Sequence, residues 1–408
     1  MSDKLHDPYA AIRFKEFRFF ISGKLLLTIA VLMQEIVASW MIYDQTKDPL
    51  SLGLIGLTEA IPSLLLALPG GYLADKFSRR KLMLVATAIM LIASIALSIY
   101  AHTSMAFGIF PIYCVVFLIG TARGIYNPAQ ASLWPQLVDK KFYVNSSVWN
   151  SGMWQVGAVT GPALGGLFYG LIGAEDTLLV VNVLLLVTML LYSAIKHHQV
   201  EKFNHTESVK ESLKKGISYF FKQPILLSAF SLDLFAVLFG GAVAMLPVFA
   251  DQILSVGPQG LGILRSAPAI GAVAMSIFQA YHPPKNNAGI KMLLCVAGFG
   301  LCMIGFALSE AFWLSFTFLL LSGIFDNVSV VIRSTILQLY TPNEMRGRVS
   351  AVNSIFVGSS NELGAFESGV AAKFMGLVPS VIFGGCMTLI VTLIAYRLAP
   401  SLKKLTLP

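Results

Sequence analysis

Residues 52–101 read LGLIGLTEAIPSLLLALPGGYLADKFSRRKLMLVATAIMLIASIALSIYA, two long apolar runs joined by a short basic turn. About 20 apolar residues in a helix cross the ~30 Å hydrocarbon core of a bilayer, so each run can span a membrane. The same pattern continues in both directions along the chain. It predicts an all-α membrane protein with twelve transmembrane helices, at residues 17–42, 52–75, 81–101, 107–131, 146–172, 177–195, 224–250, 259–281, 289–308, 311–337, 350–375 and 379–398.

The basic residues are distributed unevenly over the connections between these runs. Of the 29 Lys and Arg residues, 23 fall in seven alternate segments that include both termini, and the six other connections contain only Lys47. Cytoplasmic connections of membrane proteins are enriched in Lys and Arg. We therefore expect a multi-pass protein of the cytoplasmic (inner) membrane with both termini in the cytoplasm.

The composition argues against other classes of protein. With 56% hydrophobic and 12% charged residues, the chain cannot cover a soluble globule, since ordinary proteins are about 25% charged. The net charge of +8 is dispersed over loop ends, so no nucleic-acid partner is expected. The four cysteines all lie in apolar runs, without the neighbours that a metal site needs. No nucleophile–base pair stands out either, and we expect neither an enzyme nor a bound cofactor or metal.

The chain contains an internal repeat. Residues 120–166 laid over residues 323–369 match at several Gly positions and at an Asn-Ser pair. A parallel repeat of six-helix halves is typical of transporters whose substrate site lies between the halves, near the middle of the membrane. We predict a first bundle at 1–195, a basic cytoplasmic linker at 196–223 and a second bundle at 224–408. Within the linker, Glu207–Phe221 is either an amphipathic helix on the cytoplasmic surface or a solvated connection.

The basic turn after the second helix, residues 71–81, carries Gly71, Asp75, Arg79 and Arg80. This spacing resembles the loop signature of the major facilitator superfamily. The resemblance implies that the glycine lets neighbouring helices approach, and that the acid and the two arginines form a cytoplasmic gate by latching that side shut. The alternative is that the cations only anchor the topology.

The fifth predicted helix contains a string of glycines around a proline: Gly157, Gly161, Pro162, Gly165 and Gly166. Glycines four residues apart open a groove for close helix packing, and the proline bends the helix because it lacks a backbone donor. The string resembles the Gly-x-x-x-Gly-Pro-x-x-Gly-Gly motif of the superfamily's proton-coupled exporters. The resemblance implies export rather than import.

Further stretches are similar to one branch of the superfamily, the enterobactin-exporter-like branch of drug:proton antiporter type. They are residues 123–129, 232–242, 264–268, 345–349 and 360–369. The resemblance implies alternating access and proton-driven export of a siderophore, a drug or a related amphipathic small molecule. The proton gradient would then be the driving force, without a cofactor.

Several ionisable residues lie inside the apolar runs, where a charge costs at least ~2.5 kcal/mol to insert and is a functional candidate by default. In the two-half architecture, helices 1, 4, 7 and 10 line the cavity. Their residues are candidates for handling protons and substrate: Glu35, Arg123, Asp233, Asp326 and Arg333. The others are expected where the two halves meet: Glu59, Arg265, Glu362 and Glu367.

Depth along the helices suggests how these groups pair. Asp233 and Arg333 fall at similar depth and are predicted to pair, which would make Asp233 structural rather than protonatable. Arg123 and Asp326 are expected to face each other across the cavity. Glu35 has no cation at its level on its own helix, so we predict that it is the proton acceptor, with Arg123 as its modulator. Arg123 has an alternative role in a buried ion pair that only orders the bundle.

These observations together predict a monomeric secondary transporter that exports an amphipathic small molecule against protons. A facilitator or importer of a nutrient is one alternative, and its transport would not depend on a pH gradient. A transporter-like membrane sensor or scaffold is another, and its cavity would lack accessible carboxylates.

Overall fold

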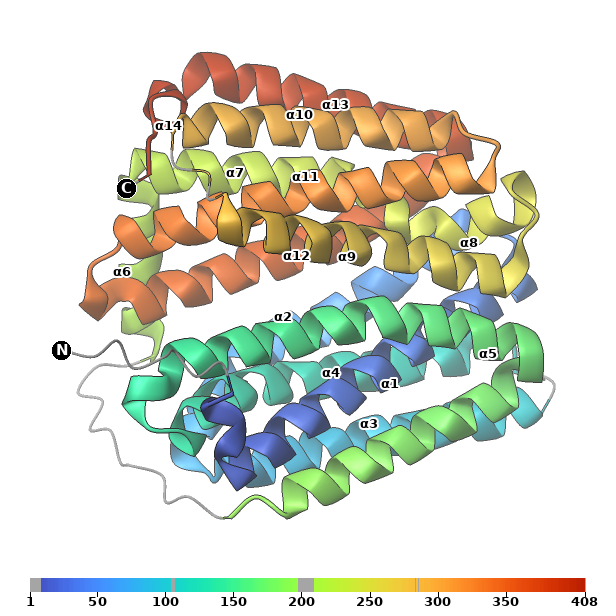
Figure 1. Ribbon diagram of the computed structural model, residues 1–408. Coiled ribbons are helices and arrows are strands. Elements are labelled where there is room, and N and C mark those ends of the chain that lie inside the picture. The colour runs from blue at the N-terminus through green and yellow to red at the C-terminus, as the bar shows by residue number, and fades with distance from the viewer. Residues whose placement is uncertain (1–8, 104–106, 197–208, 283, 285, 408) are drawn as a thin grey trace. The chain divides into compact units, whose positions relative to one another are not determined.

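The computed structural model describes residues 9–103, 107–196, 209–282, 284 and 286–407, and every regular element in this part of the chain is a helix (Figure 1). The predicted all-α class is confirmed. The chain forms two compact units, one of Met1–Ala38 with Ile61–Asn204 and the other of Ser39–Ala60 with His205–Pro408. Each unit is described by itself below.

The first unit contains most of the first six predicted helices. They are α1 (Lys15–Thr46), α2 (Pro49–Lys76), α3 (Arg79–His102), α4 (Phe110–Leu133) and α5 (Tyr143–Ser193), with short 3-10 turns at Ala11–Arg13, Trp134–Leu137 and Lys140–Phe142. The tip of the α1–α2 hairpin, Ser39–Ala60, belongs to the second unit. The unit's apolar core includes Phe17, Phe20, Met83 and Tyr192, all of which are fully buried.

The long helix α5 contains two predicted helices, 146–172 and 177–195. They meet at Gly173, whose φ of +80° and ψ of 178° are not helical. Only glycine adopts such a conformation without strain, because it has no Cβ. The two predicted helices are therefore present, joined by a kink instead of a loop.

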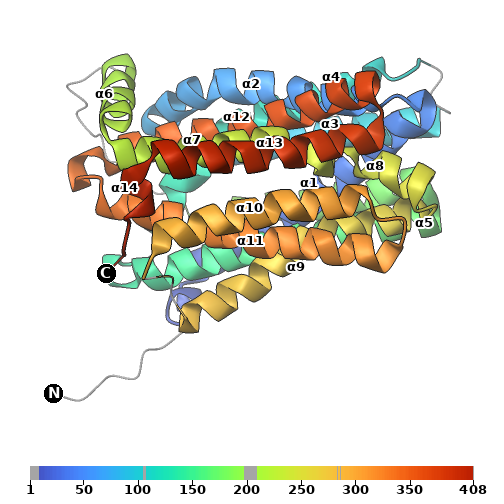
Figure 2. The same ribbon diagram turned by 90° about the horizontal axis from the view of Figure 1, so that it is seen from above.

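The second unit contains the remaining helices: α6 (Val209–Lys222), α7 (Pro224–Phe239), α8 (Leu246–Val248), α9 (Gly257–Tyr281), α10 (Ala288–Ala307), α11 (Phe312–Leu339), α12 (Asn343–Met375), α13 (Leu377–Leu398) and α14 (Pro400–Lys403). Helix α10 lies beside both α11 and α13 (Figures 1 and 2). The linker contains a helix, α6, as one of the two alternatives predicted, whereas its placement on the cytoplasmic surface stays a prediction and residues 197–208 lie outside the described part.

The seventh predicted run, 224–250, is not one regular helix. After α7 come a 3-10 segment (Gly241–Met245), α8 and a π-helical turn (Phe249–Ile253). The break occurs at two glycines, a residue type that weakens a helix. A Cβ at Gly241 would lie 2.5 Å from the carbonyl oxygen of Gly364 in α12, so the absence of a side chain allows α12 to approach closely.

Ten helical segments of the described chain are long and apolar enough to cross a membrane. One of them, residues 145–193, holds the two helices that meet at Gly173. Helix α12, 33 residues long, coincides with the predicted run 350–375 and begins with polar turns. Counting both parts of α5 and adding α12 gives the twelve transmembrane helices that the sequence predicts.

Candidate functional site

The glycine string of α5 packs directly on α1. A Cβ placed at Gly161 would lie 2.8 Å from the Cβ of Leu32, and one at Gly165 would lie 2.9 Å from the Cα of Met33. Gly157 meets the same face of α1 one turn earlier, and each distance is too short for a real side chain. The groove predicted from the spacing of these glycines is therefore present, and α1 occupies it.

Two other members of the string shape the same helix. Pro162 lies inside α5, where it removes one backbone donor, and Gly166 is buried. Met33 of α1 lies against this groove. The packing therefore fixes the position of Glu35, two residues further along α1, relative to α5.

The charged residues predicted for the N-terminal cavity are only partly buried. Glu35 on α1 and Arg123 on α4 are both half-buried. Each takes part in a polar or electrostatic interaction, so Glu35 is not the isolated carboxyl that the sequence argument assumed. Their roles in proton transfer stay predictions.

A buried lysine in the same unit was missed as a candidate. Lys24 on α1 is 8% exposed, and its Nζ donates to the side-chain oxygen of Asn150 at 2.7 Å and to the Asn150 carbonyl at 3.1 Å. A signal was available, since Lys24 stands inside the first apolar run and Asn150 belongs to the repeated Asn-Ser pair. The contact joins α1 to the start of α5.

The arginines of the basic turn bind the C-terminal ends of three helices. Arg79 is buried and donates to the carbonyls of Ala74 in α2 and Ser132 in α4, both at 3.3 Å. Arg80 donates to the carbonyl of Tyr192, at 3.2 Å, and to that of the next residue of α5. Cations are favourable at helix C-termini, where carbonyls lack partners. The two arginines thus hold α2, α4 and α5 together at one end of the first unit.

The close helix approach expected at Gly71 occurs one residue earlier. A Cβ at Gly70 would collide with the carbonyl oxygen of Gly124 in α4, whereas among the described residues nothing lies within 4 Å of a Cβ at Gly71. A shift of one residue turns a helical position by about 100°, which explains the difference. The side chain of Asp75, the other member of the predicted gate, lies outside the described part.

The second unit contains a buried ion pair. The guanidinium of Arg333 on α11 contacts the carboxylate of Asp233 on α7, and both side chains are 7% exposed. The same guanidinium lies 5.9 Å from the ring centre of Phe230. The pairing predicted from depth is therefore present. Removing one partner of an ion pair this deeply buried would destabilise the fold, because the other charge would lose its partner.

A second carboxylate, that of Asp326, lines the same small cavity as Asp233. A cavity of about 10 Å³ is lined by Asp233, Asp326 and Ser329, with apolar side chains around them. This volume is about the smallest that can hold one water molecule. Among the described residues, the Ser329 hydroxyl and the Arg333 Nε are buried without a hydrogen-bond partner. The cluster therefore contains two carboxylates and one guanidinium, and the unmatched Ser329 side chain belongs to the lining of the cavity.

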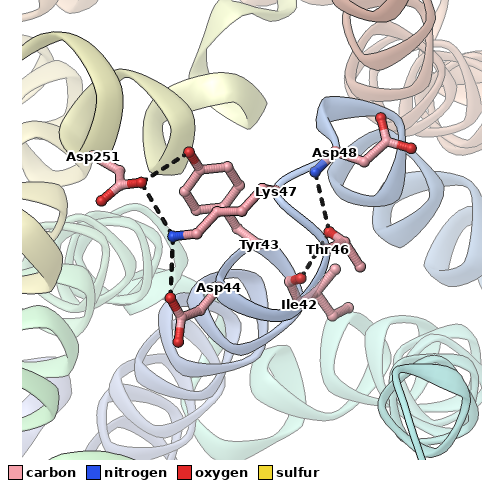
Figure 3. Close-up of polar contacts among 7 residues, drawn as sticks. All are labelled: Ile42, Tyr43, Asp44, Thr46, Lys47, Asp48 and Asp251. Carbon is pink, nitrogen blue, oxygen red and sulfur yellow. Dashed lines mark hydrogen bonds and ion pairs between the residues drawn. The ribbon is translucent and has the colours of Figure 1, made fainter.

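A polar network surrounds the connection between α1 and α2, within the second unit (Figure 3). The carboxylate of Asp251, in the π-helical turn, accepts from the Tyr43 hydroxyl at 3.0 Å and pairs with Lys47 at 3.2 Å. Lys47 also pairs with Asp44 at 3.1 Å. Desolvation lowers the pKa of Lys47, but its bonds to the two acids outweigh this effect and leave that pKa above its usual 10.5.

Further contacts fix the same hairpin. Asp48 pairs with Lys373 of α12 at 3.1 Å. A Cβ at Gly53 would lie 3.0 Å from the Cα of Gly369, so α2 and α12 touch backbone to backbone. Residues 39–60 are therefore held by two ion pairs and a glycine contact, and Lys47, the one basic residue of the alternate connections, takes part in one of these pairs.

The residues predicted for the interface between halves occupy varied surroundings. Arg265 donates to the carbonyl of Val243 at 3.0 Å, within its own unit. Glu59 is buried, Glu362 is half-buried, and both take part in polar or electrostatic interactions. Glu367 is also half-buried. Whether these groups exchange partners during transport stays a prediction.

Comparison with known families decides the class of the protein. The pattern of a major facilitator family described as "transmembrane secretion effector" matches residues 6–405. The chain belongs to this family. Members of the major facilitator superfamily are membrane transporters, so this chain is a transporter and not an enzyme.

Curated relatives of this secretion effector are similar over most of their length. The staphyloferrin A transporter of Staphylococcus aureus is 22% identical over 393 residues, covering 95% of this chain and 97% of the relative. The multidrug efflux pump Tap of Mycolicibacterium fortuitum is 21% identical, with 90% and 91% covered. The enterobactin exporter of Escherichia coli is 23% identical over 348 residues, with 82% and 80% covered.

Solved transporter structures share the fold of this family member. A POT family transporter in complex with 5-aminolevulinic acid superposes with a TM-score of 0.76 at 13% identity, covering 95% of this chain and 96% of that one. A bacterial homologue of the human lysosomal transporter Spinster gives 0.72 at 14% identity, with 95% of each chain covered. At such identities the likeness concerns the fold alone.

Proposed function

We propose that this secretion effector exports an amphipathic small molecule, such as a siderophore or drug, by alternating access driven by the proton gradient. Relatives named for staphyloferrin A, enterobactin and multidrug efflux support the substrate class and the direction. The protein works as a monomer of two six-helix halves, 1–195 and 224–408, joined by the linker 196–223. It lies in the cytoplasmic membrane with both termini in the cytoplasm, as the distribution of Lys and Arg indicates.

The cluster of Asp233, Asp326 and Arg333, in which Asp326 is half-buried and the other two are buried, carries the proposal. Two carboxylates and one guanidinium have a net charge of −1, and the cluster is neutral when one proton is bound. Uncompensated charge is expensive at membrane depth, so a proton and a rearrangement of α7 and α11 are energetically linked. Such a link between proton binding and helix movement is what a group that gains and loses one proton per transport cycle requires.

The two acids have different roles in this proposal. Asp233 is held by Arg333, so it fixes α7 against α11 and keeps the guanidinium in place. Among the described residues, Asp326 makes no direct ion pair with that arginine, and it lines the small cavity beside the pair. Asp326 therefore carries the proton, which reaches it through a single water.

Glu35 and Arg123 form the second candidate site for protons, in the first half. We predict that Glu35→Gln abolishes proton-coupled efflux while substrate binding stays measurable. Unchanged efflux in that variant would assign the proton site to the cluster of the second half alone. Loss of coupling in both Glu35→Gln and Asp326→Asn would place one proton step in each half.

The contacts at the two ends support roles in gating. Arg79, Arg80, Gly71 and Asp75 belong to the proposed cytoplasmic gate, for which the bonds of the two arginines to helix ends supply a rigid support. At the other end, the hairpin 39–60 is proposed to detach from Asp251 and its neighbours when the outer side opens. Contacts set by Glu59, Arg265, Glu362 and Glu367 would change during the same movement.

Metabolite profiling of the growth medium tests the proposed function. A deletion strain and its parent are grown with and without iron, and the medium is compared before and after the gene is restored. We expect a small amphipathic metabolite to be missing from the deletion strain's medium, and a protonophore to reduce its export in the parent. Uptake that is independent of the pH gradient would instead identify a facilitator or importer.

A further inference from the structure

One face of α6 is fastened to the second unit. Phe220 is fully buried, with its ring centre 5.4 Å from that of Phe230 in α7 and 5.2 Å from that of Phe356 in α12. The Tyr219 hydroxyl donates to the carbonyl of Tyr340, the residue that ends α11, at 2.8 Å. Helix α6 therefore contacts α7, α12 and the end of α11.

The other face of α6 is exposed and combines apolar with basic side chains. Ile217 is 39% exposed and Phe221 is 54% exposed. They are four residues apart and so lie on the same side of the helix. Lys215 and Lys222 are also exposed. Over its whole length α6 has four lysines and one glutamate, a composition typical of helices that lie in a membrane interface.

The position of α6 matches that composition. It runs across the ends of α7 and α12 instead of alongside them, at the end where α14 also lies (Figures 1 and 2). The membrane span that contains α7 begins at Pro224, two residues after α6 ends. The short helix α14 lies at the same end. It contains Lys403, and the exposed Lys404 follows it.

We propose that α6 binds anionic phospholipid headgroups at the membrane surface. Lys215 and Lys222 contact the phosphates, and Ile217 and Phe221 enter the region between headgroups and acyl chains. Basic side chains next to a negatively charged leaflet are attracted to it, and their aliphatic stems can lie along apolar surface. Since Tyr219 and Phe220 hold α6 to the transmembrane helices, headgroup binding favours one arrangement of those helices.

Hydrogen exchange of the purified full chain tests this inference without requiring a known cargo. The protein is placed in nanodiscs of phosphatidylcholine alone or with phosphatidylglycerol, at low and high salt. We expect the amides of residues 216–222 to exchange severalfold more slowly with phosphatidylglycerol, and the difference to shrink at high salt because screening weakens the attraction. The double variant Lys215→Gln/Lys222→Gln should lose the difference.

A matched control removes two charges elsewhere. Lys140 and Lys141 are exposed on another basic segment, so Lys140→Gln/Lys141→Gln should keep the lipid-dependent protection of α6. Equal exchange in the two lipids would overturn the inference, and so would equal loss in the control, which would indicate a general effect of net charge. Protection that appears with an acidic polypeptide such as polyglutamate but not with phosphatidylglycerol would identify a protein partner and reject the lipid. Failure of transport would not affect this result.

Discussion

Replacing Gly165 by alanine tests the packing of α5 on α1. The new Cβ would lie 2.9 Å from the Cα of Met33, about 0.5 Å short of the 3.4 Å at which ordinary contact begins. The nearest atoms belong to the α1 backbone, which cannot rotate away as a side chain could. The helices must therefore separate, and overpacking of this kind costs about 1–3 kcal/mol.

A matched substitution in the same helix isolates that cost. Gly152 is also in α5, and nothing lies within 4 Å of a Cβ there. Both changes gain the helical preference of alanine over glycine, about 0.5–1 kcal/mol. The difference between Gly165→Ala and Gly152→Ala is therefore the packing cost alone. At about 2–4 °C per kcal/mol for a unit of this size, the variants should differ by roughly 2–12 °C in Tm.

Thermal unfolding of the purified variants in one detergent measures this difference. Gly152→Ala should unfold at or slightly above the wild-type temperature, and Gly165→Ala clearly below the Gly152 variant. The Gly165 variant should also export more slowly, because Glu35 moves with the displaced α1. Equal unfolding temperatures for the two variants would refute the account of the α1–α5 contact.

Three other substitutions have defined outcomes. Asp233→Asn leaves Arg333 buried without its anion and should lower the stability to unfolding by about 3–5 kcal/mol, so a wild-type Tm would show that the pair is dispensable. Because the pKa of Lys47 is raised, the stability that its charge contributes is complete below about pH 10.5 and is lost above it. The difference in Tm between the wild type and Lys47→Met should therefore be constant from pH 6 to 9 and shrink in stronger alkali. A difference that shrinks near neutral pH would contradict this. Arg80→Ala removes the donors at the end of α5 and should speed amide exchange there, whereas unchanged exchange would show that the helix end is held by other groups.

The sequence was sufficient for the features that depend on hydropathy and on spacing along one helix. The apolar runs predicted the twelve helices, because the length of a run decides whether it can span a bilayer. The four-residue spacing of Gly157, Gly161 and Gly165 predicted a groove, because such residues line up on one helix face. The similar depth of Asp233 and Arg333 along their helices was enough to predict that they pair, because few cations are available to a buried carboxylate.

Features that depend on rotation of a helix or on tertiary contact could not be obtained in this way. The close approach in α2 lies at Gly70 and not at Gly71, a difference that depends on which side of α2 faces α4. The polar interaction of Glu35 comes from the fold, while the sequence compared only groups on its own helix. The burial of Phe220 could not be read from the linker, because its aromatic partners come from α7 and α12.

Proton movement in proteoliposomes tests the central claim most directly. The purified protein is reconstituted around a pH-sensitive dye, and the metabolite identified by profiling the growth medium is added as the cargo. We predict that cargo and protons move in opposite directions in the wild type and in Glu310→Gln, a control that removes an exposed carboxylate of the same unit. Asp326→Asn should bind the cargo but move no protons. Proton movement at the wild-type rate in Asp326→Asn would contradict the account.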